Sequence, residues 1–271
     1  MTDWDARFAA FRAAHKPARA RLAGSDWEYI DAGEGPPAIL LLPGGLGVAE
    51  SSFRAISRLE PRARVIAPTI PAVGDVGQVV DGLAGLLDHA GLERVHVSGH
   101  SLGSGLAHVL VRRHPDRVGR LALGSFGLYT RTHARLATLF LRLPPRLLAA
   151  YYRRAAARLT SDADPAEAAF LRATVDEVLR DPREGLARLQ LLVDLVNHPR
   201  RYRLFEPVER PGRVLIIGAA DDRGFSAVER EALITAYPGA TVRIFPRGGH
   251  WVALAEQAAY EATLDGFLLD A

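Results

Sequence analysis

The 271-residue chain is 48% hydrophobic and 24% charged, a balance typical of a folded globular protein and unlike that of a disordered or fibrous chain. It contains no cysteine, which excludes thiol catalysis, thiolate metal sites and disulfide bonds. The net charge is only +3, and the arginines that supply nearly all of the basic charge are spread among acidic residues, so no nucleic-acid partner is expected.

The first residues do not have the pattern of a secretory signal. Asp3 and Asp5 place acidic side chains where a signal peptide needs positive charge, and Trp4, Phe8 and Phe11 would instead share one face of a helix. No apolar run approaches the roughly 18–20 residues that a membrane-spanning helix needs. We therefore expect a cytoplasmic protein without a membrane span.

Short apolar runs alternate with longer helical patterns over most of the chain. Strands are predicted at Trp27–Asp31, Ala38–Leu42, Val65–Ala67, Val95–Ser98, Val118–Leu123, Val214–Gly218 and Thr241–Phe245. Helices are predicted at Ser51–Leu59, Gln78–His89, Leu102–Arg113, Ala227–Tyr237 and from about Ala253. This alternation is typical of an α/β protein, with a parallel sheet covered by helices on both faces.

The alternation stops after Phe126. Residues 129–210 contain only helical patterns interrupted by prolines, which predicts an all-helical insertion in a core formed by residues 1–128 and 211–271. The stretch from Gly127 to Arg210 has 15 arginines and 10 acidic residues, so the rest of the chain is mildly acidic. Five of these arginines are candidates to attract a carboxylate-bearing substrate, the alternative being that they are simply solvated: Arg131, Arg153, Arg154, Arg200 and Arg201.

The strongest catalytic signal is the segment Gly99-His100-Ser101-Leu102-Gly103, which lies between a predicted strand and a predicted helix. A serine on such a sharp turn needs neighbours without side chains, because the backbone is strained and closely packed there. Gly99 and Gly103 meet that need, and the turn would lift the Ser101 hydroxyl above the sheet at the start of a helix. Ser101 is therefore the predicted nucleophile, and a passive serine in a tight turn is the alternative.

A serine nucleophile needs an adjacent base. His250 is the best candidate among nine histidines, because it follows two glycines beyond a predicted strand, at the edge where open α/β sheets build their sites. His100 flanks the nucleophile but is expected to point away into the structure. An acid should orient His250, and the first choice is Asp221, three residues after the glycine that ends the preceding strand, with Asp222 as the alternate.

The anionic intermediate of such a reaction needs preorganised N–H donors. Leu102, directly after the nucleophile, should provide one donor, and the glycine-rich loop Pro43–Gly47 should provide the other. Within that loop Gly45 is the first choice and Leu46 the alternate, since Pro43 has no N–H. The spacing of a dinucleotide-binding loop and the lysine of a phosphate-binding loop are missing, so neither a cofactor nor a metal is expected.

These segments make the chain similar to the α/β-hydrolase superfamily along nearly its whole length. The resemblance is strongest to the maspardin-like branch, through Leu42-Pro43, Gly47–Glu50, Asp81–Leu83, Leu87–His89 and Tyr237–Ala240. It implies a mostly parallel sheet of about eight strands flanked by helices, with the insertion as a helical cap. Two positions depart from the superfamily pattern: Pro71–Asp75 replaces the usual glycine–serine segment after the fourth strand, and Pro43 stands where many superfamily members have histidine, a departure that the maspardin-like branch shares.

We predict a serine hydrolase that cleaves a carboxylic ester, thioester or lactone through an acyl-enzyme. Its substrate would be a small molecule with an apolar acyl part, for which Phe126, Leu128 and Trp251 are candidate pocket residues and equally candidates for plain core. Two alternatives stay open: the same triad could perform C–C bond hydrolysis, perhydrolysis or a lyase step, or, as the resemblance to maspardin implies, the protein could bind ligands with an idle triad. The sequence carries no signal for oligomeric state.

Overall fold

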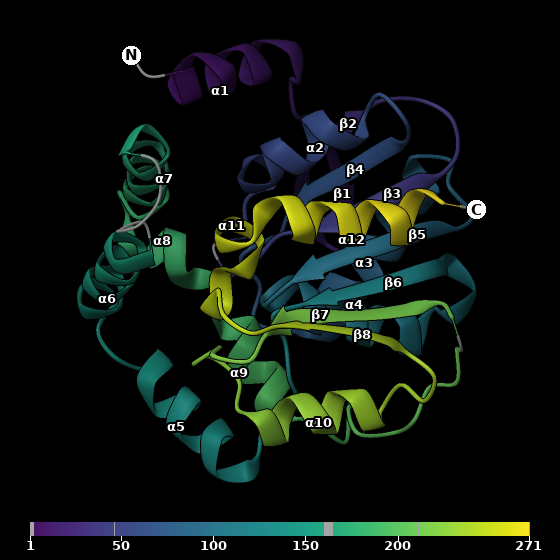
Figure 1. Ribbon diagram of the computed structural model, residues 1–271, viewed down its shortest axis with the longest axis vertical. Coiled ribbons are helices and arrows are strands. Elements are labelled where there is room, and N and C mark those ends of the chain that lie inside the picture. The colour runs from purple at the N-terminus through teal and green to yellow at the C-terminus, as the bar shows by residue number, and fades with distance from the viewer. Residues whose placement is uncertain (1–2, 46, 160–164, 211, 271) are drawn as a thin grey trace.

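Figure 1 shows the protein as a computed structural model, which describes residues 3–45, 47–159, 165–210 and 212–270. The strands are β1 (Ala18–Leu22), β2 (Ser25–Ala32), β3 (Ala38–Leu42), β4 (Arg64–Thr69), β5 (Val95–His100), β6 (Val118–Gly124), β7 (Val214–Ala219) and β8 (Thr241–Phe245). The α-helices are α1 (Asp3–Ala14), α2 (Phe53–Leu59), α3 (Val76–His89), α4 (Leu102–Arg113), α5 (Arg131–Leu141), α6 (Pro145–Leu159), α7 (Pro165–Val178), α8 (Pro182–Ala187), α9 (Gln190–Asn197), α10 (Ala227–Thr235), α11 (Val252–Ala255) and α12 (Gln257–Leu269). Short 3-10 helices are η1 (Ala49–Ser52), η2 (Pro115–Arg117) and η3 (Gly249–Trp251). None of the described helices is both long and apolar enough to cross a membrane.

The eight strands form one sheet in the order β1-β2-β4-β3-β5-β6-β7-β8. Pairing is antiparallel between β1 and β2 and between β2 and β4, and parallel from β4 to β8. The predicted fold class, a mostly parallel sheet flanked by helices, is therefore confirmed. All predicted strands are present, within a few residues of their predicted limits.

Side chains alternate between two cores, one on each face of the sheet. In β3, Leu40 and Leu42 pack with α3 and α4, whereas Ile39 and Leu41 pack with α1, α2 and α12 on the other face. Because both faces are covered, β3 and β7 are apolar at every position and appear in the sequence as continuous hydrophobic runs.

The edge strand β1 was not predicted. Its sequence alternates small apolar residues with arginine, and Arg19 and Arg21 pair with Glu28 and Asp26 on the neighbouring strand. Charged side chains of this kind are typical of an edge strand, which must avoid pairing with other chains. Apolar and charged residues alternate over only five positions, and this pattern is too short to distinguish a strand from a loop.

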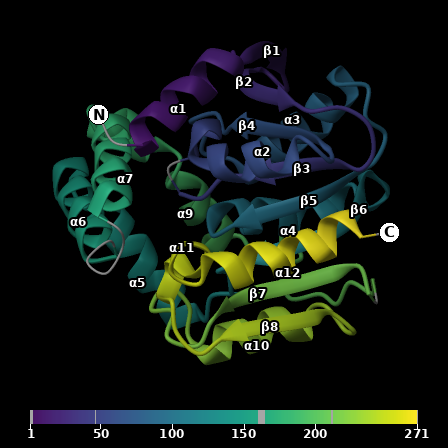
Figure 2. The ribbon, with the colours of Figure 1, turned by 45° about the horizontal axis from the view of Figure 1, so that its top comes forward.

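The chain segment between β6 and β7 forms only helices, α5 to α9, in the part that the structure describes. We call these five helices the helical insert. Figures 1 and 2 show it beside the carboxyl ends of the parallel strands. Most of it has a small core of its own, but Leu191 and Leu195 of α9 join the core over α3 and α4. The Asp194 carboxylate between them accepts a hydrogen bond of 2.8 Å from the Val76 N–H at the start of α3, which fastens α9 to the sheet domain.

Helix α4 and strand β3 approach too closely to leave room for a side chain. A Cβ atom at Gly103 would lie 2.1 Å from the Leu42 carbonyl oxygen, and one at Gly99 would lie 2.4 Å from the Gly103 carbonyl oxygen. Both obstacles are backbone atoms of central elements, so neither can move aside cheaply. The close approach fixes the position of the first turn of α4 relative to the sheet.

We expect Gly103→Ala to lower the free energy of unfolding by about 2–3 kcal/mol, because the methyl group can be accommodated only by shifting packed backbone. Gly74→Ala is the matched control: a Cβ atom there meets nothing within 4 Å, and the change should stay within about 0.5 kcal/mol. Urea denaturation of the two variants measures the difference. Equal stabilities would contradict the tight contact.

Candidate active site

Ser101 stands on a strained turn between β5 and α4. Its backbone lies in the left-handed region, with φ 52° and ψ −115°, which a residue with a side chain rarely adopts. Neighbouring hydrogen bonds hold the turn: the Ser101 N–H donates to the Gly124 carbonyl at 2.9 Å, and the Ser104 hydroxyl lies within hydrogen-bond distance of the Gly99 and Gly124 carbonyls. The turn therefore presents the Ser101 side chain at the amino end of α4, at the carboxyl edge of the sheet.

His250 bridges Ser101 and a buried carboxylate. Its Nε2 atom lies 2.9 Å from the Ser101 Oγ, and its Nδ1 atom lies 3.0 Å from one oxygen of Asp222 and 3.2 Å from the other. Asp222 follows β7, and His250 lies in η3 after β8, so the segments that follow β5, β7 and β8 supply the three side chains at the carboxyl edge of the sheet. The chain order is serine, aspartate, histidine.

The pKa of Asp222 lies below its ordinary value. Burial by itself raises the pKa of this carboxyl, but the hydrogen bond and charge of His250 and a 2.7 Å hydrogen bond from the Gly224 N–H outweigh it. Asp222 is thus an anion at neutral pH, and it accepts the Nδ1–H of His250. This leaves the Nε2 of a neutral His250 free to accept a proton from the Ser101 hydroxyl.

The first-choice acid of the sequence analysis, Asp221, does not contact His250. It is exposed, and its carboxylate accepts a 2.8 Å hydrogen bond from the Gly249 N–H. The alternate, Asp222, is the one that the structure places against the imidazole. The reason is that β7 continues to Ala219, one residue beyond the predicted end. The position in the following turn whose side chain points toward His250 is therefore also one residue later, at Asp222.

His100 was expected to point away from the site, but it contacts the loop that carries His250. Its Nε2 lies 3.1 Å from the His250 carbonyl oxygen, and the two rings are 5.4 Å apart. Burial, together with the neighbouring His250, lowers the pKa of His100 to about 4. At neutral pH it is therefore a neutral imidazole whose Nε2–H donates to that carbonyl.

The glycine-rich loop after β3 lies against the same histidine. A Cβ atom at Gly44 would be 3.2 Å from the His100 Nδ1, so the loop passes directly beside the serine turn. Gly45 follows in this loop, while Leu46, its alternate as an N–H donor, lies outside the described residues. Leu102 is the first residue of α4, so its amide has no acceptor within the helix. Leu102 thus directly follows Ser101, and Gly45 lies in the loop that passes beside His100.

An aromatic pair extends from His250 into the core. The Phe225 ring lies 6.0 Å from the His250 ring and 5.3 Å from the Phe126 ring. Phe126 is buried beside α4, and Leu128 is buried further along the same segment. Trp251 is half-buried on the other side, with its ring 6.0 Å from that of His100. Phe225 was not singled out in the sequence, although it lies three residues after Asp222.

The insert arginines proposed from the sequence lie on the surface. Arg153 pairs with Asp176 at 2.6 Å and Arg201 pairs with Asp75 at 2.7 Å, and the remaining three, Arg131, Arg154 and Arg200, are exposed. A different arginine of the insert reaches the glycine-rich loop. The Arg188 side chain donates to the Ile70 carbonyl, and its Cδ would be 2.1 Å from a Cβ atom at Gly47. No local pattern in the sequence distinguishes Arg188 from its neighbours.

Among the described residues, no three histidine, aspartate or glutamate side chains lie close enough together to bind a metal ion.

Comparison with known proteins identifies the fold family. The model of the alpha/beta hydrolase fold family matches residues 37–257. The chain belongs to this family. It is 28% identical to a 2-hydroxymuconate semialdehyde hydrolase of Pseudomonas putida, over 92% of each chain. It is 26% identical to a 2-hydroxy-6-oxononadienedioate/2-hydroxy-6-oxononatrienedioate hydrolase of Cupriavidus pinatubonensis, over 88% of this chain and 89% of that one.

Solved structures share the fold at lower identity. An enol-lactonase from Burkholderia xenovorans has a TM-score of 0.72 at 20% identity and covers 93% of this chain and 99% of its own. A 2-hydroxy-6-oxo-6-phenylhexa-2,4-dienoate hydrolase from Rhodococcus has a TM-score of 0.73 at 22% identity, with the same coverage. The superfamily assignment is thus confirmed, while the finer resemblance to maspardin stays a prediction.

We expect the protein to lose stability as the pH falls from about 7 towards 4. The unfolded chain binds a proton at His100 near its ordinary pKa of about 6.5, whereas the folded protein resists protonation until about pH 4, so unfolding takes up a proton in this window. Allowing for partial exposure, His100 should contribute about 2 kcal/mol of this loss. Urea denaturation at about pH 7 and about pH 4.5 measures the change.

His100→Gln provides the control for that experiment, because glutamine can donate to the His250 carbonyl but cannot take up a proton. Its unfolding free energy should depend less steeply on pH than that of the wild type. Identical slopes for the two proteins would show that His100 does not titrate as described.

Proposed function

We propose that the protein is a serine hydrolase that cleaves a carboxylic ester, thioester or lactone with Ser101, His250 and Asp222. The observation that supports this most directly is the continuous hydrogen-bonded path from the Ser101 hydroxyl through His250 to a buried, ionised Asp222. A serine hydroxyl gains nucleophilicity when an adjacent base can take its proton, and a base works best when a third group orients it.

The reaction follows from these positions. Ser101 Oγ attacks the substrate carbonyl while His250 Nε2 takes its proton, and the Asp222 carboxylate stabilises the imidazolium that forms. The amides of Leu102 and Gly45 bind the oxyanion. His250 then gives the proton to the leaving alcohol, thiol or lactone oxygen. Water, activated by the same histidine, releases the acid from Ser101 and restores the enzyme.

Two further residues position the base. The Asp221 carboxylate accepts a hydrogen bond from the Gly249 N–H, and the His100 side chain donates one to the His250 carbonyl. The backbone is therefore hydrogen-bonded both before and after the His250 side chain. Neither side chain reaches the reacting atoms in this mechanism. Their contribution is to keep the imidazole within hydrogen-bond distance of Ser101.

The helical insert serves as a cap in this proposal, with residues 129–210 as its extent. The side chain of Leu189, between α8 and α9, would lie 3.1 Å from a Cβ atom at Gly45, so the insert contacts the glycine-rich loop after β3. Leu195 of α9 lies against Gly105 and close to Phe126, which puts apolar side chains of both domains next to the serine turn. A small substrate with an apolar acyl part suits such surroundings.

Hydrolysis of a C–C bond beside a ketone is a second candidate on the same triad. It is favoured by the full-length relatives, whose names describe hydrolases of semialdehydes and of oxo-dienedioates. Ser101 would attack the ketone as before, and the leaving group would depart as a stabilised carbanion that takes its proton from His250. Such substrates carry carboxylates, and the Arg188 guanidinium beside the glycine-rich loop would supply a complementary charge.

We expect a fluorophosphonate probe to label the wild type on Ser101 and to leave Ser101→Ala unlabelled. p-Nitrophenyl esters of graded chain length, lactones, and a 2-hydroxy-6-oxo-dienoate should then be tested side by side with both proteins, because product analysis separates ester from C–C cleavage. Turnover of the esters supports the first candidate and turnover of the dienoate alone supports the second. A protein that binds these compounds without labelling or turnover would be a binding protein with an idle triad.

Asp222→Asn should lower kcat by roughly three to four orders of magnitude, because an amide cannot hold the required tautomer or stabilise the imidazolium. Asp221→Asn is the matched control, since it changes the adjacent carboxylate in the same way and should lower kcat less than about tenfold. Steady-state kinetics on the substrate found above provide the comparison. A larger effect at Asp221 would exchange the roles of the two acids.

A further inference from the structure

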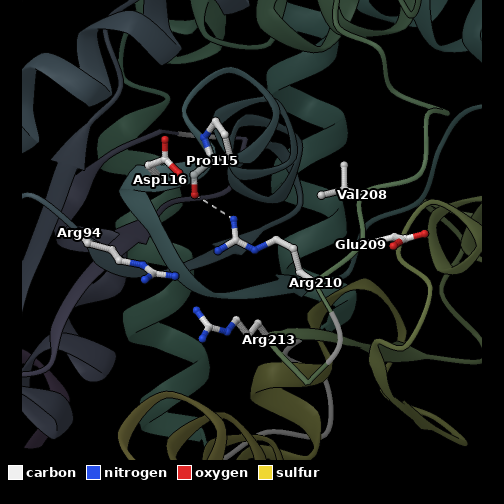
Figure 3. A pocket seen from close by; sticks show the side chains of 7 residues that line it. All are labelled: Arg94, Pro115, Asp116, Val208, Glu209, Arg210 and Arg213. Carbon is white, nitrogen blue, oxygen red and sulfur yellow. Dashed lines mark hydrogen bonds between the residues drawn. The ribbon is translucent and has the colours of Figure 1, made fainter.

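Three arginine side chains converge at the edge of the sheet opposite the proposed active site (Figure 3). Arg94 directly precedes β5, Arg213 directly precedes β7, and Arg210 lies three residues before Arg213. Because β5 and β7 run in the same direction, their amino ends meet at one edge, while Ser101 and Asp222 follow their carboxyl ends. The length of a six-residue strand, about 20 Å, separates the two places.

The arginines line a cavity of about 580 Å³, within the range of small-molecule sites. The remaining lining residues are Pro115, Asp116, Val208 and Glu209. Figure 3 shows the three guanidinium groups pointing toward one another across the cavity, whereas the Glu209 side chain points away from them. The cavity thus has a positively charged centre and an apolar side formed by Pro115 and Val208.

Arg210 brings a positive charge that no carboxylate neutralises by direct contact among the described residues. Its guanidinium donates to the carbonyls of Pro115 at 3.0 Å and Gly119 at 3.1 Å, and to that of Val118. Carbonyl groups satisfy N–H donors but carry no net charge, so the full cationic charge remains. Burial, then the nearby charges of Arg94 and Arg213, lower the pKa of Arg210, and the smaller opposing effect of Asp116 does not cancel them.

The side chains of Arg94 and Arg213 have no hydrogen-bond or ion-pair partner within the described part of the chain. Both are exposed, so their donors face the cavity and solvent. A hollow of similar size on β1 and β2, about 500 Å³, provides the contrast. There Arg19 and Arg21 are each paired with a carboxylate, at 3.1 Å and 2.8 Å. At the amino edge Asp116 and Glu209 also line the cavity, but no ion pair joins either of them to the three arginines among the described residues.

We propose that this cavity is a binding site for a small molecule that carries a diphosphate group. Arg94 and Arg213 would bind the phosphate oxygens through their guanidinium forks, and Arg210 would supply fixed positive charge beneath them. A diphosphate matches three converging cations better than a single carboxylate does, and the cavity volume leaves room for an organic part against Pro115 and Val208. The site is separate from the hydrolase chemistry and does not depend on it.

Isothermal titration calorimetry of the full chain tests the proposal with inorganic pyrophosphate, adenosine diphosphate and adenosine at about 0.1 M salt. The first two should bind saturably with Kd below about 100 μM, and adenosine should not bind at that level. The double variant Arg94→Ala/Arg213→Ala should weaken both anions at least about tenfold. Arg19→Ala/Arg21→Ala removes the same charge elsewhere and should change Kd less than about twofold.

Stability in the absence of ligand provides the check on folding. Both exposed double variants should keep the thermal unfolding midpoint and the catalytic rate of the wild type, and Arg213→Glu should abolish anion binding with the fold intact. Three results would overturn the proposal: no saturable binding of either anion by the wild type, the same loss in both double variants, or adenosine binding as tightly as adenosine diphosphate. If pyrophosphate and adenosine diphosphate bind equally, recognition rests on the diphosphate alone.

Discussion

One residue held in the left-handed conformation determines the geometry of the rest of the site. Ser101 would relax out of this conformation, which costs about 1–3 kcal/mol, if its surroundings did not hold it. Hydrogen bonds to β6 and the contact of α4 with β3 keep it there. The same contact that strains the turn also brings the amino end of α4 to the sheet edge. The Ser101 side chain and the amino end of α4 are therefore positioned by a single packing constraint.

The charges around His250 are arranged asymmetrically. On one side stands the buried carboxylate of Asp222, an anion that favours the imidazolium, and on the other stands His100, which stays neutral because it is buried next to a second imidazole. A protonated His100 would repel the charge that His250 acquires during the proposed reaction. The low pKa of His100 thus keeps a second cation away from His250 at neutral pH.

The sheet and the strand-to-helix turn at Ser101 could be predicted from the sequence because each depends on neighbouring residues alone. Strands β3 and β7 are continuous apolar runs because both of their faces are buried, and the glycines around Ser101 are needed where backbone segments approach closely. What could not be predicted depends on distant contacts. Arg188 and Phe225 reach the site from separate elements, and the choice between Asp221 and Asp222 turned on one extra residue in β7. The short edge strand β1 was missed for lack of a distinctive pattern.

The place where the helical insert leaves and rejoins the sheet has an evolutionary consequence. It departs after β6 and returns at β7, and these two strands are hydrogen-bonded neighbours. Its first and last helices, α5 and α9, contact each other beside the carboxyl ends of the strands, so the number or length of the helices between them can change without altering any strand pairing. Such a protein can exchange its helical insert while the sheet and the serine turn stay unchanged. Divergence within the family should accordingly be concentrated in the insert and slow in the strands that carry Ser101 and Asp222.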